Sequence, residues 1–363
     1  MSKVKDLLIR IREAVKTGTM QADAALIDKI THIVKAELDN NKFSFSKEQC
    51  RDLFITINQL REDFSNSMQD TAAALLYFDA LILCVNTIST AIYALISKEY
   101  WEYKHQTELG DPEIRDVIEH IGKTNQIQVF NYDFVEEYKT LPVEVFSDES
   151  CGMFYVPYRN RRMYFPKGWQ EADVVYYYKW VMMEQDQRSP HCYDHEDYGV
   201  LQGDVVVDAG VAEGNFALNV IDKVKKIYLI EADERWIEAL EKTFASDMDK
   251  VEIIRGFLSG ETSGDNVCLD QLFAEQPVNY VKMDIEGYEK QALSGAKKVI
   301  GQAENIRCAV CTYHFYEDEE LIRKQLQDYG FETEVSKGYM FPDITMEELI
   351  DARLRRGLIF GRK

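Results

Sequence analysis

The chain has 363 residues, more than one hydrophobic core usually supports, so its length predicts two or three domains. Its 63 acidic and 42 basic side chains give a net charge of -21, which repels polyphosphates and argues against binding of DNA or RNA. The seven cysteines are scattered, and the first residues read as an amphipathic helix rather than a signal peptide. We therefore expect a cytoplasmic protein that binds no nucleic acid.

Residues 2–123 have helical periodicity with few glycines or prolines, and we expect residues 1–124 to form a helical domain. This domain would mediate self-association into a homo-oligomer or dock a partner. Within it, the run from Ala72 to Ser97 is long enough to span a bilayer. Because the run contains Asp79 and Asn86 and polar helical sequence flanks it, we expect a buried bundle or oligomer helix and no membrane span.

Residues 125–202 read as a mixed α/β lead-in. Alternation in Met153–Pro166 around a polar turn at Arg159–Arg162 predicts a hairpin, and residues 173–185 predict a helix. Aromatic side chains are dense in both segments. They would offer stacking surfaces to a sugar or an apolar acceptor, or else form core and interface.

From residue 203 to residue 363, strand and helix patterns alternate, which predicts a parallel sheet covered by helices on both faces. Two late strands, at residues 331–337 and 356–363, predict an antiparallel edge hairpin. Cys308 and Cys311 form a CxxC within one predicted strand, where positions three apart point to opposite faces. We therefore do not expect a zinc site there.

The glycine turn of this region lies in VVVDAGVAEGNFAL, residues 205–218. The spacing from Gly210 to Gly214 is GxxxG, with Ala212 between, and not the GxGxxG of a dinucleotide site. The carboxylates of Asp208 and Glu213 stand where a diphosphate would lie, and they suit a cation better. S-adenosylmethionine combines a sulfonium and an ammonium with a carboxylate, which a helix N-terminus favours. The predicted cofactor contacts here are Asp208, Gly210, Glu213, Gly214, Asn215 and Phe216.

The second strand, KIYLIEA, ends at Glu231, whose carboxylate could accept hydrogen bonds from a ribose diol. The alternative is that Glu231 caps a helix. The segments that follow this strand and the next one would line the nucleoside pocket. The residues expected there are Ala232, Asp233, Trp236, Phe257 and Leu258.

Four segments are similar to those of a known protein family: VVVDAGVAEGNFAL, IEADERW, VCLDQLF and especially VKMDIEGYEKQAL, residues 281–293. They resemble the FkbM family of S-adenosylmethionine-dependent methyltransferases, members of which methylate hydroxyl oxygens of sugars and natural products. The likeness extends over residues 125–363, including RMYFP. It implies a Rossmann-like sheet of seven strands, the last one antiparallel. The family often has a smaller residue at the place of Glu213, and residues 1–124 fall outside the shared domain.

Methyl transfer to oxygen requires in-line placement and a group that receives the acceptor proton. Asp284, at the end of the fourth strand, is predicted to orient or deprotonate the acceptor hydroxyl, with Glu286 close by. Either carboxylate could instead cap the following helix. His314, at the end of the fifth strand, would act as a base or pair with Asp284 around a divalent ion such as Mg²⁺.

Arg188 and His191 precede the first strand of the sheet, where they would cover the methionine end of the cofactor. For Arg188, a surface ion pair is an equal alternative. We conclude that the sequence predicts an O-methyltransferase acting on a saccharide or a glycosylated small molecule. The alternatives are an NAD-dependent oxidoreductase and a non-catalytic module that binds adenosine or a protein.

Overall fold

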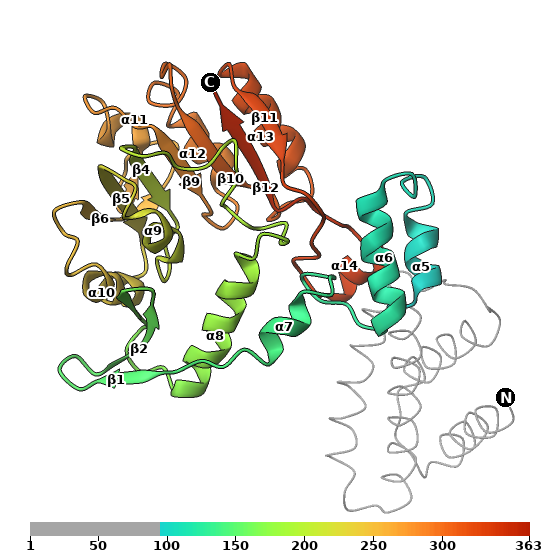
Figure 1. Cartoon of the computed structure of the whole chain (residues 1–363). Coiled ribbons are helices and arrows are strands. Elements are labelled where there is room, and N and C mark those ends of the chain that lie inside the picture. The colour runs from blue at the N-terminus through green and yellow to red at the C-terminus, as the bar shows by residue number, and fades with distance from the viewer. Residues whose placement is uncertain (1–94) are drawn as a thin grey trace, which may run out of the picture. The chain divides into compact units, whose positions relative to one another are not determined.

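The computed structural model describes residues 95–363, which divide into two compact units (Figure 1). The first unit contains the residues up to Gln128 together with Asp343–Arg353, and the second contains Val129–Pro342 and Leu354–Lys363. Most of the run from Ala72 to Ser97 lies outside the described residues. Between residues 95 and 363, no helix is both long and apolar enough to cross a membrane.

The described part of the first unit is helical, as predicted. It comprises α5 (Lys98–Lys104), α6 (Pro112–Thr124) and α14 (Met346–Asp351). Asp111 caps α6 by accepting a hydrogen bond from the amide of Glu113, and Pro112 occupies the first helical turn, where its missing N–H costs nothing. The helix ends at Asn125 in the left-handed conformation. Local sequence signals therefore set both ends of α6.

A seven-stranded sheet forms the centre of the second unit. Its strands lie in the order β11, β12, β10, β9, β4, β5, β6, and β12 runs antiparallel to both of its neighbours. The remaining pairs are parallel. This arrangement confirms the predicted Rossmann-like sheet with an antiparallel last strand. The strands are β4 (Val205–Ala209), β5 (Lys226–Glu231), β6 (Val251–Arg255), β9 (Tyr280–Met283), β10 (Arg307–Cys311), β11 (Glu332–Val335) and β12 (Leu358–Arg362).

Helices cover both faces of the sheet, and two hydrophobic clusters pack against it. Val206 belongs to one cluster and Val207 to the other, as alternation along a strand requires. Cys311 and Cys308 are likewise divided between the two clusters, so the predicted opposite orientation of the CxxC is confirmed. The helices of this region are α9 (Asn215–Val220), α10 (Glu234–Thr243), α11 (Leu269–Leu272), α12 (Glu289–Ser294) and α13 (Asp318–Asp328), and a short parallel pair joins β7 (Phe257–Leu258) to β8 (Asn266–Val267).

The lead-in segment belongs to the same unit as the sheet. Its elements are α7 (Val135–Lys139), β1 (Phe146–Asp148), β2 (Met153–Tyr158), β3 (Arg161–Tyr164) and α8 (Glu171–Glu184), and β1, β2 and β3 form an antiparallel sheet. The predicted hairpin is confirmed with a shorter turn, because Arg161 already pairs with Tyr158. Arg161 also donates to Asp247, which follows α10, and this bond ties the hairpin to the main sheet's helices.

Candidate active site

The glycine turn after β4 is shaped by two close approaches. Gly210 has φ +71°, and a Cβ atom there would lie 1.7 Å from the carbonyl oxygen of Asp284. Gly214 has φ +81°, and its Cβ would lie 2.9 Å from the side chains of Leu240 and Phe244 in and after α10. The first glycine therefore lets β9 end against the turn, and the second lets α10 pack against the start of α9.

Replacing Gly210 by alanine should destabilise the second unit more than replacing Gly203 does. Gly203 also has a positive φ, +90°, but a Cβ there meets nothing within 4 Å. Gly203→Ala therefore isolates the conformational cost, about 1–2 kcal/mol. Gly210→Ala adds a backbone clash, for which we expect about 1–3 kcal/mol more. Urea unfolding of both variants tests this, and equal losses would show that the turn relaxes freely.

A cavity of about 820 Å³ lies along the carboxyl ends of the strands, beside the glycine turn. It brings together most of the side chains that the sequence singled out. The predicted residues that line it are Gly210, Glu213, Asn215, Glu231, Ala232, Asp233, Trp236, Phe257, Leu258, Asp284 and Glu286. Gly214 and Phe216 lie just outside the lining, where they pack against α10 and Tyr280 respectively.

At the β5 side of the cavity, Glu231 holds two loops together. Its carboxylate accepts hydrogen bonds from the amide of Ala212 at 2.9 Å and from the amides of Ala232 and Asp233 at 2.8 and 2.9 Å. Asp233, and not Glu231, caps α10 by accepting from the amide of Arg235. Glu231 therefore fixes the glycine turn against the loop after β5 while its carboxylate faces the cavity.

The structure does not place Asp208 among the cavity-lining residues. Its side chain is buried, and Oδ1 lies 3.1 Å from the ammonium nitrogen of Lys282, which is buried as well. Burial alone would lower the pKa of Lys282, but the carboxylates of Asp208 and Asp284 outweigh it and hold the pKa above its usual range. The negative charge of Asp208 is therefore compensated by Lys282 and is not directed at a ligand.

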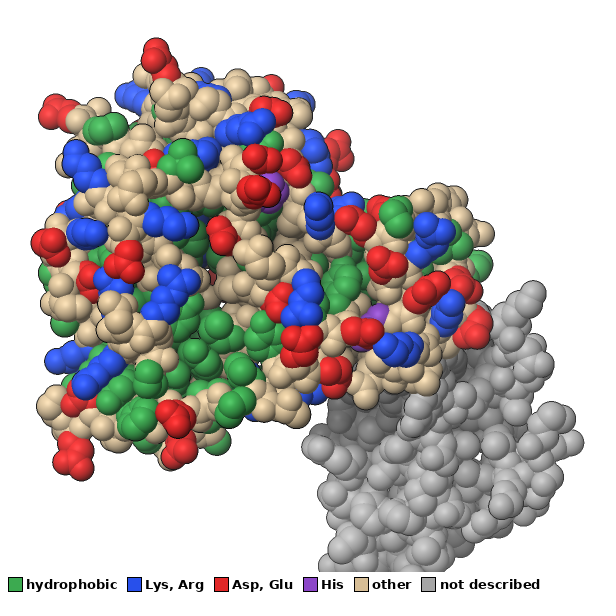
Figure 2. Space-filling model, viewed as in Figure 1, with side chains coloured by type: hydrophobic (Ala, Val, Ile, Leu, Met, Phe, Trp, Pro, Cys, Tyr) green, Lys and Arg blue, Asp and Glu red, His purple; other side chains and the backbone are tan. Residues whose placement is uncertain are grey.

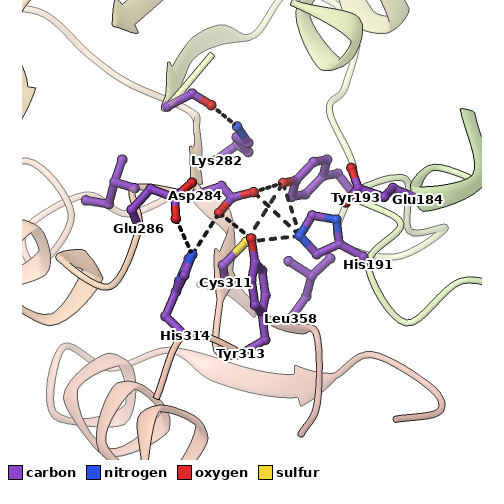
Figure 3. A network of polar contacts seen from close by, with 12 residues as sticks. Glu184, His191, Tyr193, Lys282, Asp284, Glu286, Cys311, Tyr313, His314 and Leu358 are labelled. Carbon is purple, nitrogen blue, oxygen red and sulfur yellow. Dashed lines mark hydrogen bonds and ion pairs between the residues drawn. The ribbon is translucent and has the colours of Figure 1, made fainter. Parts of the chain in front are cut away.

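Asp284 lies at the centre of a polar network (Figure 3). The hydroxyl of Tyr193 donates to Oδ2 at 2.6 Å, and that of Tyr313 donates to Oδ1 at 3.1 Å. Nε2 of His191 lies 3.5 Å from Oδ2, and Nε2 of His314 lies 3.6 Å from Oδ1. Burial alone would raise the pKa of Asp284, but these imidazoles and Lys282 lower it well below its usual range. Asp284 is therefore a permanently ionised hydrogen-bond acceptor at neutral pH.

His314 is surrounded by carboxylates. Glu289 Oε1 lies 3.2 Å from Nδ1, and Glu286 Oε2 lies 3.6 Å from Nε2. Burial alone would lower the pKa of His314, but Glu286, Glu289 and Asp284 raise it to about 10. The imidazolium therefore carries a positive charge between these carboxylates at neutral pH. The ligand atoms of Asp284, Glu289 and His314 lie within 4.8 Å of one another, so a divalent ion such as Mg²⁺ could bind there only by displacing the proton of His314.

Neither Asp284 nor Glu286 caps a helix. The residue at the start of α12 that accepts backbone hydrogen bonds is Glu289, from the amides of Ile285 at 2.9 Å and Gly287 at 3.4 Å. β9 ends at Met283, and Glu286 has φ +56°. A tight turn, and not a continued strand, thus places both Asp284 and Glu286 at the cavity.

Three further predicted residues, Arg188, His191 and His314, do not line the cavity. Arg188 is exposed and pairs with Glu137 at 2.7 Å and Asp186 at 2.6 Å, so these two carboxylates satisfy its guanidinium away from the cavity. This corresponds to the surface ion pair that was its alternative. His191 is buried and contacts Asp284 from behind the lining, with its Nε2 3.6 Å from the sulfur of Cys311. It therefore positions Asp284 and does not reach the cavity.

Several lining residues were not identified from the sequence as site residues. They are Glu184, Tyr193, Lys282, Tyr288 and Tyr313, whereas Tyr177 and Trp180 belong to the aromatic helix that the sequence offered as a stacking surface. A signal existed for Lys282, because a lysine inside the apolar strand YVKM must have a buried partner. Glu184 ends the aromatic helix α8, which gives a weaker signal.

Comparison with known proteins gives one family. Residues 228–333, from β5 to β11, match the model described as the methyltransferase FkbM domain. Comparison with curated proteins finds no match. The matched segment contains Glu231, Asp284 and His314 and begins after the glycine turn.

Among solved structures, the chain is similar to precorrin-6y C5,15-methyltransferase from Geobacter metallireducens, with 11% identity over 46% of this chain and 84% of that chain and a TM-score of 0.33. An rRNA methylase from Streptococcus thermophilus gives 16% identity over 45% and 89%, with a TM-score of 0.32. A protein from Streptococcus mutans in complex with SAH gives 13% over 45% and 91%, with a TM-score of 0.29. The family match, on a sheet of the expected order, identifies residues 228–333 as part of an FkbM methyltransferase domain.

Proposed function

We propose that the chain transfers a methyl group from S-adenosylmethionine to a hydroxyl oxygen of a sugar or a glycosylated small molecule. The observation that carries the proposal is the charge of the cavity. Six carboxylates and one lysine line it, and the ammonium of that lysine already faces Asp208 and donates to the carbonyl oxygen of Gly210 at 2.6 Å. Such a cavity favours a cationic cofactor over a dinucleotide diphosphate.

In this proposal the nucleoside lies at the β5 and β6 side of the cavity. The ribose hydroxyls donate to Glu231, whose Oε2 has accepted only one backbone hydrogen bond. The adenine lies against Phe257 and Leu258, which follow β6. The methyl group then points toward β9 and β10, where Asp284 and Tyr313 line the cavity.

The acceptor oxygen attacks the methyl carbon in line, the carbon–sulfur bond breaks, and its electron pair stays on sulfur. Asp284 accepts a hydrogen bond from the acceptor hydroxyl and directs its oxygen toward the methyl. With its low pKa, Asp284 is a weak base, but an oxygen that carries the new methyl and still holds its proton is strongly acidic. The proton can therefore pass to the carboxylate of Asp284 late, as the new oxygen–carbon bond forms.

The rim of the cavity supports a sugar acceptor. Tyr288 is 59% exposed although it lines the cavity, so its ring is open to stack on a sugar face. The carboxylate of Glu286 is also exposed there and can accept hydrogen bonds from hydroxyls. On the face shown in Figure 2, acidic and basic side chains are interspersed, without the basic stripe that nucleic acid would require.

Calorimetry with S-adenosylmethionine and NADH tests the cofactor. We expect S-adenosylmethionine to bind and NADH not to bind, and we expect Glu231→Gln to weaken binding by about tenfold, the loss of one charge-assisted hydrogen bond. Glu252→Gln removes an acid from the far end of β6 and should leave the affinity unchanged. Binding of NADH in place of S-adenosylmethionine would refute the proposal.

Mass spectrometry of glycan extracts incubated with deuterated-methyl cofactor tests the reaction. We expect a labelled product that depends on the protein and that Asp284→Asn abolishes, while this variant still binds the cofactor. Cofactor binding without any labelled product would instead indicate a non-catalytic module. Undiminished transfer by Asp284→Asn would remove Asp284 from the mechanism.

A further inference from the structure

Two carboxylates line the cavity from separate elements, Glu213 in the glycine turn and Glu184 at the end of α8. The hydroxyl of Tyr177 donates to Glu213 Oε2 at 3.0 Å, and the indole N–H of Trp180 donates to Glu184 Oε1 at 2.7 Å. Within residues 95–363, neither carboxylate forms an ion pair. Neither carboxylate therefore has a close cationic partner, unlike Asp208 with its lysine, and burial raises the pKa of both.

The position of these carboxylates follows from the order of the strands. In the proposed function, the nucleoside lies beyond β5 and the acceptor lies beside Asp284 after β9, and β4 is between these two strands. The cofactor sulfur must therefore lie near the turn that follows β4. Glu213 belongs to that turn, and its contact with Tyr177 shows that α8 covers it.

The walls around the two carboxylates are aromatic. Tyr177, Trp180, Tyr193 and Trp236 line the same cavity, and the rings of Tyr177 and Trp236 lie 5.4 Å apart. Aromatic faces attract cations, and a site with few solvent contacts strengthens the attraction of a cation to a carboxylate. The combination suits a cation without exposed hydrogen-bond donors, which describes a sulfonium.

We infer that Glu213, assisted by Glu184, recognises the positive charge on the cofactor sulfur and so distinguishes S-adenosylmethionine from its product S-adenosylhomocysteine. The inference rests on the proposed function. Methyl transfer leaves a neutral thioether, so the attraction to the two carboxylates disappears in the step that forms the product. The adenosine and amino-acid parts are the same in both molecules, so contacts to these parts alone would hold the product as tightly as the cofactor. The loss of the charge on sulfur weakens binding of the product and so favours its release.

The recognition should depend on pH. Burial raises the pKa of Glu213 to about 7, and the charge of Glu184 adds to the effect. Glu213 is therefore ionised above neutral pH and protonated below it. The titratable groups that face the pair from the neighbouring elements are Tyr158 of β2, Tyr177 of α8, His191, Lys282 and Asp284 of β9 and its end, and Tyr313 after β10.

The test is the ratio of the Kd of S-adenosylhomocysteine to that of S-adenosylmethionine, measured by calorimetry at about pH 6 and about pH 8. The α-amino group is common to both ligands, so its titration largely cancels in the ratio. An opposite charge nearby lowers a carboxyl pKa by about 1–3, and linkage gives the corresponding factor in affinity. We expect the ratio to rise about five- to tenfold from the lower to the higher pH, because tenfold is the limit for a single group with a pKa of about 7. Sinefungin, which carries an ammonium in place of the sulfonium, should follow S-adenosylmethionine.

Glu213→Gln should lower the affinity for S-adenosylmethionine at the higher pH by at least about tenfold and remove the pH dependence of the ratio. Binding of S-adenosylhomocysteine should persist, which also shows that the variant is folded. Glu252→Gln serves as the matched loss of one charge.

A ratio in the native protein that does not change with pH would overturn the inference without any variant. An equal loss of both ligands in Glu213→Gln would also overturn it, because Glu213 would then contact a part that they share. Failure of the native protein to bind any of the three ligands would refute the proposed function instead.

Discussion

Lys282→Met should lower the free energy of unfolding by about 3–5 kcal/mol at neutral pH, the usual cost of removing one partner of a buried ion pair. The lysine and Asp208 are 4% and 1% exposed, and their charged atoms lie 3.1 Å apart in the middle of the sheet. Methionine keeps the volume of the side chain but leaves the carboxylate of Asp208 without its cation. Urea unfolding at constant pH measures the loss.

The variant should also weaken cofactor binding, for a separate reason. The ammonium of Lys282 donates to the carbonyl oxygen of Gly210 at 2.6 Å, so it fixes the glycine turn directly. The double variant Asp208→Asn, Lys282→Met separates the two effects. It removes both charges and should recover much of the stability, since replacing a whole buried pair is often nearly neutral. It should not recover affinity, because the bond to Gly210 is still absent.

If the free energy of unfolding of Lys282→Met lies within about 1 kcal/mol of that of the native protein, the pair does not stabilise the fold as a buried ion pair. A loss of that size is what an exposed surface pair would give. Asp208→Asn gives the reciprocal check. It leaves a buried ammonium with two backbone carbonyls as acceptors, those of Ala209 and Gly210. We therefore expect it to destabilise the fold less than Lys282→Met does.

The sheet could be predicted because its strands are locally distinctive. Apolar runs such as Val206–Val207 and Ile227–Ile230 are buried on both faces, and alternation with helical patterns requires a parallel sheet. The short pair β7 and β8 could not be predicted, since two residues on each side carry no periodic signal. The assignment of Asp343–Arg353 to the first unit also depends on contacts between distant segments.

The site residues that lie at the ends of strands could be predicted from the sequence. Glu231 and Asp284 line one cavity because the carboxyl ends of parallel strands meet at one edge of the sheet. Tyr193 and Glu184 precede the sheet in sequence, and only packing brings them to that edge. Asp208 shows the same limit of prediction from sequence. Its negative charge suggested a contact with a cationic ligand, but in the structure the buried Lys282 compensates that charge.

His314→Gln should lower the stability of the protein by about 3–5 kcal/mol at neutral pH. The carboxylates of Glu286, Glu289 and Asp284 raise the pKa of His314 from 6.5 to about 10, and a pKa difference of one between the folded and unfolded states corresponds to about 1.4 kcal/mol. Because the pKa is higher in the folded state, this stabilisation is complete below about pH 6.5 and disappears as the pH rises through about 10. Unfolding free energies across this range measure it.

His195→Gln is the matched control, since its partly exposed imidazole lies 3.7 Å from the carboxylate of Glu334 and this contact should contribute no more than about 1 kcal/mol. The consequence for the site lies in Asp284, whose pKa His314 helps to keep low. Without the imidazolium, Asp284 should become protonated at a higher pH, so methyl transfer should fail at a pH where the native protein still works. If NMR shows that His314 titrates near pH 6.5, the surrounding carboxylates do not stabilise its charge. The loss of stability and the change in the pH range of methyl transfer should then both be absent.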